Sequence, residues 1–319
     1  MECVVHRLPM RDPGDAGGVL RLIEEGKLRP DEIVAIMAKT EGNGCVNDFA
    51  RAFALLSFSA ALAPLLGLTP AEVPGRVTMV MSGGTEGGLS PHCLVFAVSD
   101  RGTPRAGRKA LAIGTAVTRS FQNDEIGRMP QVEATAAAVR KAVRRAAIED
   151  DRDVHWVQVK CPLLTSERVA EATSRGLSTA TADGYASMGL SRAASALGVA
   201  VAFGEVDGAA LANESIGRDL SIWATRASAS AGIELMHSEI IVLGNAAGWA
   251  GDQVIAHDVM ADGIDLPALQ RVLRALGLAG SCQLDAPAAA RVTAVLALFD
   301  RRYRDLRGED DPYSSQDPG

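Results

Sequence analysis

One pattern occurs three times along the chain, and this internal repetition constrains the fold more than any other feature of the sequence. Each copy has a helical stretch, a polar connection and then the apolar and polar alternation typical of a strand. The first copy runs from VLRLIEEGKLRPDE into IVAIMAK and ends on Lys39, and the second runs from AAVRKAVRRAAIEDDRD into VHWVQVK and ends on Lys160. The third runs from LQRVLRALGL into VTAVLAL, where the matching position is Leu298. The pattern predicts an α/β fold of three similar units, the third of them shortened.

The first two copies continue to match beyond their lysines. In the first, a predicted helix opens at Arg51 and a strand, VTMVM, leads into residues 82–86 (SGGTE). In the second, a predicted helix opens at Arg192, and the chain then leads into residues 230–234 (SAGIE). Each of these serines precedes a small residue, a glycine and, four positions on, a glutamate, and a β-rich segment follows (CLVFAV or EIIVLGN). A lysine, arginine and Ser-x-Gly-x-Glu series repeated in order indicates a duplication.

Polar and small-residue joints suggest where the units end. The turn SDRGTP precedes the second unit, and the glycines of GWAG precede the third. The tail from residue 301 onward is charged and nearly free of aliphatic side chains, so we expect it to be disordered. The predicted units are residues 1–104, 105–248 and 249–319.

Composition narrows the functional classes. The 319 residues carry 32 Lys and Arg against 39 Asp and Glu, a net charge of -7, which argues against a nucleic-acid or anionic-membrane surface. The most apolar stretch, residues 52–68, is shorter than the ~20 residues of a membrane span and contains Pro64, so we expect a buried helix. The N-terminus has no signal-peptide pattern, and the five cysteines and five histidines are scattered. We therefore expect a cytoplasmic protein without a disulfide framework, metal site or cofactor.

Serine and lysine together can perform nucleophilic catalysis. A serine hydroxyl needs a base, and a lysine serves as one when burial or a neighbouring cation lowers its pKa. A small residue and a glycine after the serine let backbone N–H groups approach a substrate oxygen. Arginines offer planar donors to ring carbonyls and imide nitrogens. This set suits attack on an amide carbonyl through an acyl-enzyme, provided that lysine and serine lie within about 3 Å.

Other interpretations of the same residues remain open at this point. A lysine that ends a strand is often a solvated charge, and Arg51 and Arg192 could simply begin surface helices. The Ser82 segment could cradle a phosphate, although it lacks the pattern of a P-loop. The glutamates Glu86 and Glu234 could pair with the arginines or hold the lysines. Nothing in the residues alone favours Ser230 over Ser82 as the nucleophile.

Four longer strings resemble one known family: AKTEGNGCVNDFAR, VMSGGTEGGLSPH, VQVKCPLLTSER and RASASAGIELMHSEIIVLGN. They are similar to the ring-opening cyclic amide hydrolases, the family of cyanuric acid amidohydrolase and barbiturase, over about residues 1 to 275. The resemblance implies three units around a pseudo-threefold axis and a small planar cyclic amide or imide at the centre. It also implies a homo-oligomer, for which a homotetramer is the expected form. It implies Lys160 as base and Ser230 as nucleophile, with Lys39 in support. It also implies a set of residues that grip the ring: Arg51, Ser82, Gly83, Arg192, Ser230 and Ala231.

The third unit departs from the family pattern. The family's third unit carries its own lysine, arginine and Ser-Gly motif, with a structural metal nearby. Here the lysine position is Leu298 and no third Ser-Gly motif precedes Gly319. On this ground we expect no metal; the identity of the cyclic amide or imide stays open, and the departure argues against cyanuric acid. The alternative is a catalytically degenerate member that acts as a small-molecule binding or assembly protein.

Overall fold

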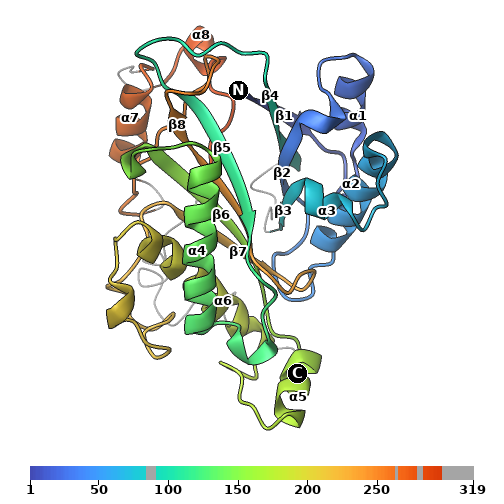
Figure 1. Cartoon of the computed structure of the whole chain (residues 1–319), viewed down its shortest axis with the longest axis vertical. Coiled ribbons are helices and arrows are strands. Elements are labelled where there is room, and N and C mark those ends of the chain that lie inside the picture. Colours follow the sequence, from blue (N-terminus) through green and yellow to red (C-terminus); the bar gives the residue numbers. More distant parts are fainter. Residues whose placement is uncertain (84–90, 263–264, 279–282, 297–319) are drawn as a thin grey trace. The chain divides into compact units, whose positions relative to one another are not determined.

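Two four-stranded sheets, both within the first 255 residues, form the framework of the candidate site (Figure 1). The computed structural model describes residues 1–83, 91–262, 265–278 and 283–296. By compactness the chain divides into one unit of residues Met1–Ile255 and a second of residues Ala256–Gly319. Within the described ranges, no helix is both long and apolar enough to cross a bilayer.

The first sheet has the strand order β1-β4-β2-β3. Strands β1 and β2 are antiparallel to β4, whereas β2 and β3 are parallel and need a crossover connection. Helices α2 and α3 provide that crossover, and α2 ends where Gly67 adopts the left-handed conformation. The elements are β1 (Glu2–Pro9), α1 (Gly17–Glu24), η1 (Pro30–Glu32), β2 (Ile33–Lys39), α2 (Ala50–Leu66), α3 (Val73–Arg76), β3 (Thr78–Ser82) and β4 (His92–Ser99).

The second sheet repeats this arrangement with the order β5-β8-β6-β7. Here β6 and β7 are the parallel pair, and α5 and α6 lie in the connection between them. The elements are β5 (Ala110–Val117), η2 (Asn123–Glu125), α4 (Met129–Arg145), η3 (Asp151–Asp153), β6 (Val154–Pro162), α5 (Ser166–Ser174), α6 (Gly184–Ala202), η4 (Gly208–Ala210), β7 (Ala227–Gly232) and β8 (Glu239–Ala246).

The two sheets share more than strand order. Each has an irregular register at the same place, between Ile33 and Ala35 in β2 and between Val154 and Trp156 in β6. The predicted α/β class is confirmed, and the shared topology is consistent with a duplicated unit. A pseudo-threefold arrangement, and unit limits near residues 104 and 248, remain predictions.

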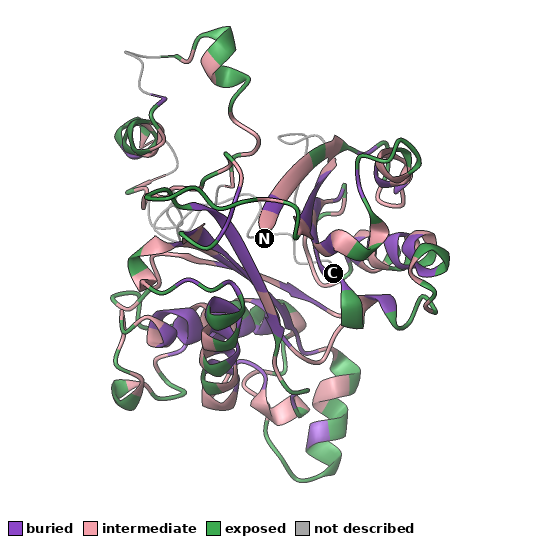
Figure 2. Cartoon of the chain, turned by 45° about the horizontal axis from the view of Figure 1, so that its top comes forward, coloured by how far each residue is buried: buried purple, intermediate pink, exposed green. Residues whose placement is uncertain are grey.

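Packing around the two sheets buries the strands that end at the candidate site. The apolar stretch at residues 52–68 falls largely in α2, whose Phe58 and Leu62 are buried in one core with Ile36 and Met81. Strands β6 and β8 are buried almost throughout (Figure 2). Helices α4 and α6 pack with the second sheet, and β3 of the first sheet also contacts β6 and β8. Burial from both sides produces the dry surroundings that lower the pKa of a lysine and favour its uncharged form.

Helices α4 and α6 pack against each other, with a glycine at their contact. A Cβ atom on Gly198 would lie 2.7 Å from both the Thr135 Cβ and the Val132 carbonyl oxygen, so only glycine fits there. The abundance of small residues in α6 therefore allows two helices to cover one narrow sheet.

Two local predictions are wrong. Helix α6 begins at Gly184 rather than Arg192, because the Asp183 carboxylate accepts a hydrogen bond from the Ala186 N–H (2.7 Å) and caps the helix earlier. In the second unit, which holds α7 (Leu266–Ala275) and α8 (Ala286–Ala289), residues 292–296 form no strand. The described parts of that unit contain no other strand with which this segment could pair. Leu298 lies outside the described residues, as does the tail from residue 301.

Candidate active site

Two lysine–serine pairs lie at equivalent positions on the two sheets. Lys39 at the end of β2 is the direct neighbour of Ser82 on β3, and Lys160 on β6 is the direct neighbour of Ser230 on β7. Directly paired residues on parallel strands project to the same face. The Nζ–Oγ distances are accordingly short, 3.3 Å for the first pair and 3.5 Å for the second. Both are compatible with proton transfer in an enzyme without bound substrate.

Lys160 has the environment of a base. Its side chain is only 1% exposed, and its Nζ donates to the Met81 carbonyl oxygen (2.8 Å) on the first sheet. The same nitrogen lies 2.8 Å from Glu234 Oε1. Burial lowers the pKa of Lys160, Glu234 opposes that shift, and the Arg51 guanidinium adds to it. The net direction is downward, so Lys160 loses its proton at a lower pH than an ordinary lysine.

Lys39 differs from Lys160 in burial and in partners. It is about half-buried, and its Nζ donates to the Gly83 carbonyl oxygen (3.2 Å) as well as to Ser82. Burial lowers the pKa of Lys39, and the nearby charge of Lys160 lowers it further. The two Ser–Lys pairs therefore hold equivalent positions on their sheets, but the two lysines differ in burial and in the charges near them.

Arg51 joins the two sheets at the same place. It lies in the first turn of α2 and is 2% exposed. One terminal nitrogen donates to the Ala231 carbonyl oxygen (2.6 Å), next to Ser230, and the other donates to the Cys45 carbonyl oxygen (2.7 Å). Lys160 of the second sheet thus reaches β3, while Arg51 of the first unit's helix reaches β7. These reciprocal contacts bring a Ser–Lys pair and a guanidinium together.

Arg192 is placed differently from its counterpart Arg51. It lies inside α6 with an exposed side chain, and its Nε donates to the Met188 carbonyl oxygen of the same helix (3.2 Å). Of the residues predicted to grip a ring, the structure gathers Arg51, Ser82, Gly83, Ser230 and Ala231 near the ends of β3 and β7, and leaves Arg192 exposed on its helix.

Two buried acidic residues accompany Lys160 and Arg51. The sequence analysis left the role of Glu234 open and did not single out Asp48. Glu234 pairs with Lys160, which decides between the two roles considered for it; Glu86 lies outside the described residues. Asp48 lies 3.7 Å from the Arg51 Nε and its side chain is 1% exposed. An aspartate just before an apolar helix is a helix-start signal, so the sequence did contain a hint of Asp48.

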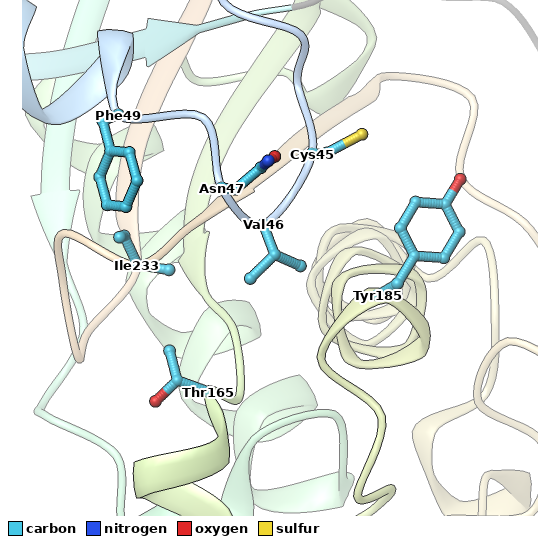
Figure 3. Close-up of a pocket in the computed structure, with 7 residues that line it drawn as sticks. All are labelled: Cys45, Val46, Asn47, Phe49, Thr165, Tyr185 and Ile233. Atoms are coloured by element: carbon cyan, nitrogen blue, oxygen red, sulfur yellow. The ribbon is translucent and has the colours of Figure 1, made fainter. Parts of the chain in front are cut away.

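A pocket of about 430 Å³ is lined by Cys45 and Ile233 among others (Figure 3). The Cys45 carbonyl oxygen accepts from Arg51, and Ile233 directly precedes Glu234. The pocket is bounded by the loop before α2, the start of α5, the first turn of α6 and the residue before Glu234. Lys160 and Ser230 are not among its lining residues. Those residues are Cys45, Val46, Asn47, Phe49, Thr165, Tyr185 and Ile233.

The described part of the chain contains no evident metal site. The described residues form no group of three or more His, Cys, Asp or Glu side chains that could hold a metal ion. The four cysteines described, Cys3, Cys45, Cys93 and Cys161, are free thiols, and burial raises the pKa of Cys3 and of Cys93 to about 12. Thiolate ligation or attack by these two residues is therefore disfavoured at neutral pH.

Comparison with known families gives the context of this geometry. The family model described as "Amidohydrolase ring-opening protein" matches residues 4–309. The chain belongs to this family. Membership confirms the resemblance seen in the sequence, and it confirms the predicted enzyme class, an amidohydrolase of the ring-opening kind.

Members of the ring-opening amidohydrolase family with curated names are similar over most of this chain. A cyanuric acid amidohydrolase of Enterobacter cloacae is 48% identical over 312 residues, which cover 97% of this chain and 84% of the relative. One from Azorhizobium caulinodans is 51% identical over 273 residues, covering 86% and 75%. A solved cyanuric acid hydrolase, described as an innovation by structural concatenation, superposes with a TM-score of 0.87 at 46% identity and covers 92% of this chain and 79% of its own.

Proposed function

We propose that this amidohydrolase opens a planar cyclic imide through Ser230 as nucleophile and Lys160 as base. The observation that carries the proposal is the position of the Lys160 Nζ, buried and 3.5 Å from the Ser230 Oγ. The lowered pKa of Lys160 supports the role of a neutral amine that accepts a proton. The equivalent Lys39 is more exposed and has no described carboxylate at ion-pair distance, which favours the second pair.

The reaction proceeds in two stages, formation of an acyl-enzyme and its hydrolysis. Lys160 Nζ takes the Ser230 hydroxyl proton as Oγ bonds to a ring carbonyl carbon, and the carbonyl oxygen becomes an oxyanion. The intermediate collapses with cleavage of the ring C–N bond, and the leaving nitrogen takes the proton from Lys160. Water then attacks the acyl-enzyme while Lys160 accepts its proton. That proton returns to Ser230 Oγ as the ester bond breaks and the open-chain acid leaves.

The remaining predicted site residues hold the ring in this proposal. Arg51 presents donors to a ring carbonyl, and the segments Ser82–Gly83 and Ser230–Ala231 supply backbone and hydroxyl groups to the other ring oxygens. Lys39 supports Ser82 rather than attacking. Arg192 remains a proposed ring contact, which would require its exposed side chain to turn toward the ring.

A panel of cyclic imides tests the proposal. The relatives are named for cyanuric acid, so it heads the panel in spite of the departure noted in the third unit, followed by barbituric acid, hydantoin and succinimide. Ring loss is followed by ultraviolet absorbance and the products by chromatography. We expect turnover of at least one ring. A folded protein that binds a ring in calorimetry without turnover over hours would instead support the degenerate, binding-protein alternative.

Replacing Glu234 by glutamine is expected to move the acid limb of the kcat/KM profile to lower pH. Burial and Arg51 lower the pKa of Lys160, whereas the Glu234 carboxylate raises it. Without that negative charge the pKa falls further, so the amine stays neutral in more acidic solution. We also expect kcat to fall about 10-fold, because Nζ loses a positioning partner. The measurement is steady-state kinetics between about pH 5 and 10.

Glu171→Gln provides the matched control, since Glu171 forms an ion pair with Arg175 (2.7 Å) at the surface of α5. Its pH profile is expected to follow that of the unmodified enzyme. An acid limb in Glu234→Gln that moves upward, or that coincides with the control, would contradict the assignment of Lys160 as the base.

A further inference from the structure

Asp48 is a buried carboxylate with several bonding partners. It lies in the loop between β2 and α2, and its side chain is 1% exposed. Its Oδ2 accepts a hydrogen bond from the Gly44 N–H (2.9 Å), and its Oδ1 accepts one from the Ala50 N–H (3.0 Å). Its Oδ2 also lies 3.7 Å from the Arg51 Nε. A single carboxylate thus links the loop, the start of the helix and the guanidinium.

Two glycines, Gly42 and Gly83, leave the space that the Asp48 carboxylate occupies. A Cβ atom on Gly42 would lie 1.8 Å from Asp48 Oδ1, and one on Gly83 would lie 1.9 Å from Asp48 Oδ2. Contacts this short are impossible, so both positions require glycine for as long as Asp48 keeps its place. Gly83 directly follows Ser82, so the Asp48 carboxylate packs closely against the backbone at the end of β3.

The backbone around Asp48 completes a cradle for Arg51. The Asp48 carbonyl oxygen accepts from the Arg51 Nε (3.4 Å), and the Cys45 carbonyl oxygen accepts from one terminal nitrogen. The other terminal nitrogen reaches the Ala231 carbonyl oxygen beside Ser230. A guanidinium buried to this degree needs a compensating charge nearby, and Asp48 provides one.

The repeat that contains the second sheet supplies a natural comparison. Arg192 corresponds to Arg51 in the repeated pattern, but the residue three positions before it is Gly189, which has no side chain to offer. Arg192 is exposed and donates to its own helix. The arginine with the carboxylate crosses to the other sheet, and the arginine without it does not.

We propose that Asp48 is the positioning residue for Arg51, fixing the guanidinium against the Ser230–Ala231 segment. The inference deepens the proposed function and rests on it, because Arg51 matters for catalysis only if the ring binds there. Asp48 acts through Arg51 and does not touch the substrate.

A double-mutant cycle of Asp48→Asn, Arg51→Lys and the double variant tests this role. Asparagine keeps the size but loses the charge and one acceptor. We expect Asp48→Asn to lower kcat/KM about 10-fold to 100-fold, mostly through a higher KM. The double variant is expected to be no worse than Arg51→Lys alone, because both changes remove one interaction. Multiplicative losses, with both single variants folded by circular dichroism, would overturn the proposal.

Asp15→Asn is the matched control. Asp15 also accepts from two backbone N–H groups, those of Arg11 and Gly17, and pairs with an arginine, Arg11, at the surface before α1. The kcat/KM of Asp15→Asn is expected to stay within about twofold of that of the unmodified enzyme, since surface ion pairs contribute little to stability. A comparable loss in this variant would mean that Asp48→Asn reports general destabilisation, and would overturn the proposal.

A second readout keeps the proposal separate from the proposed function. The Nε–H resonance of Arg51 can be assigned in a nitrogen-15 spectrum by its loss in Arg51→Lys. We expect slow solvent exchange in the unmodified chain and fast exchange or a shifted resonance in Asp48→Asn. An unchanged resonance would overturn the positioning role. If no ring is turned over, the proposed function fails while this spectrum still decides the role of Asp48.

Discussion

Replacing Ser230 by alanine is expected to lower kcat for ring opening by about 10³-fold or more, with a much smaller change in substrate affinity. The alanine removes the proposed nucleophile but leaves Lys160, Arg51 and the backbone groups in place. The Oγ has a small share in packing, so the variant is expected to fold like the unmodified chain. Steady-state kinetics give the loss, and mass spectrometry after acid quenching should detect an acyl adduct in the unmodified enzyme but none in the variant.

Ser82→Ala is the matched control, because Ser82 holds the same place in the other ladder and has its own lysine partner. We expect it to raise KM by about 10-fold while the acyl adduct still forms. If Ser82→Ala abolished the adduct and Ser230→Ala kept it, the nucleophile would belong to the first sheet and the proposed assignment would be wrong.

Replacing Lys160 by methionine is expected to lower kcat/KM by about 10²-fold to 10⁴-fold, the usual contribution of a general base. Methionine fills similar space but cannot accept the Ser230 proton. It also removes the amine that contacts the buried Glu234 carboxylate, and an unsatisfied buried acceptor destabilises the fold by about 1–3 kcal/mol. The double variant Lys160→Met with Glu234→Gln removes the buried carboxylate as well, and it should regain much of the lost thermal stability without regaining activity.

Lys160→Arg separates charge from basicity. A guanidinium keeps the positive charge beside Glu234 but cannot give up its proton, so this variant is expected to be as inactive as Lys160→Met. Lys39→Met, at the equivalent position, is expected to retain a larger share of kcat. Substantial activity in Lys160→Arg would show that position 160 acts by charge alone.

The sequence was a good guide wherever a local pattern decides the structure. Both lysines end alternating apolar segments, and both serines follow the next crossover, so their meeting across a parallel ladder could be anticipated. The structure differs where tertiary context prevails. Asp183 caps α6, so the helix begins at Gly184 and not at the predicted Arg192. Residues 292–296 form no strand, because the described part of residues 256–319 contains no strand with which they could pair.

The difference between the two Ser–Lys pairs is of the same kind. Their local sequences are alike, and nothing in them predicts that Lys160 is enclosed while Lys39 is half-exposed. The enclosure comes from packing of β3 against β6, a contact between residues far apart in the chain. The pairing of Asp48 with Arg51 was missed because a helix-start aspartate has a sufficient local explanation.

The reciprocal reach of Lys160 to the Met81 carbonyl and of Arg51 to the Ala231 carbonyl has a mechanical consequence. Neither sheet holds the complete set of proposed catalytic groups, so the proposed reaction centre depends on how accurately one sheet packs on the other. A sliding movement of about 1 Å would disturb both contacts together, and misplacement of that size costs roughly 10²-fold in rate. Rigidity against shear between the sheets is therefore a requirement of the chemistry itself, over and above the stability of either sheet.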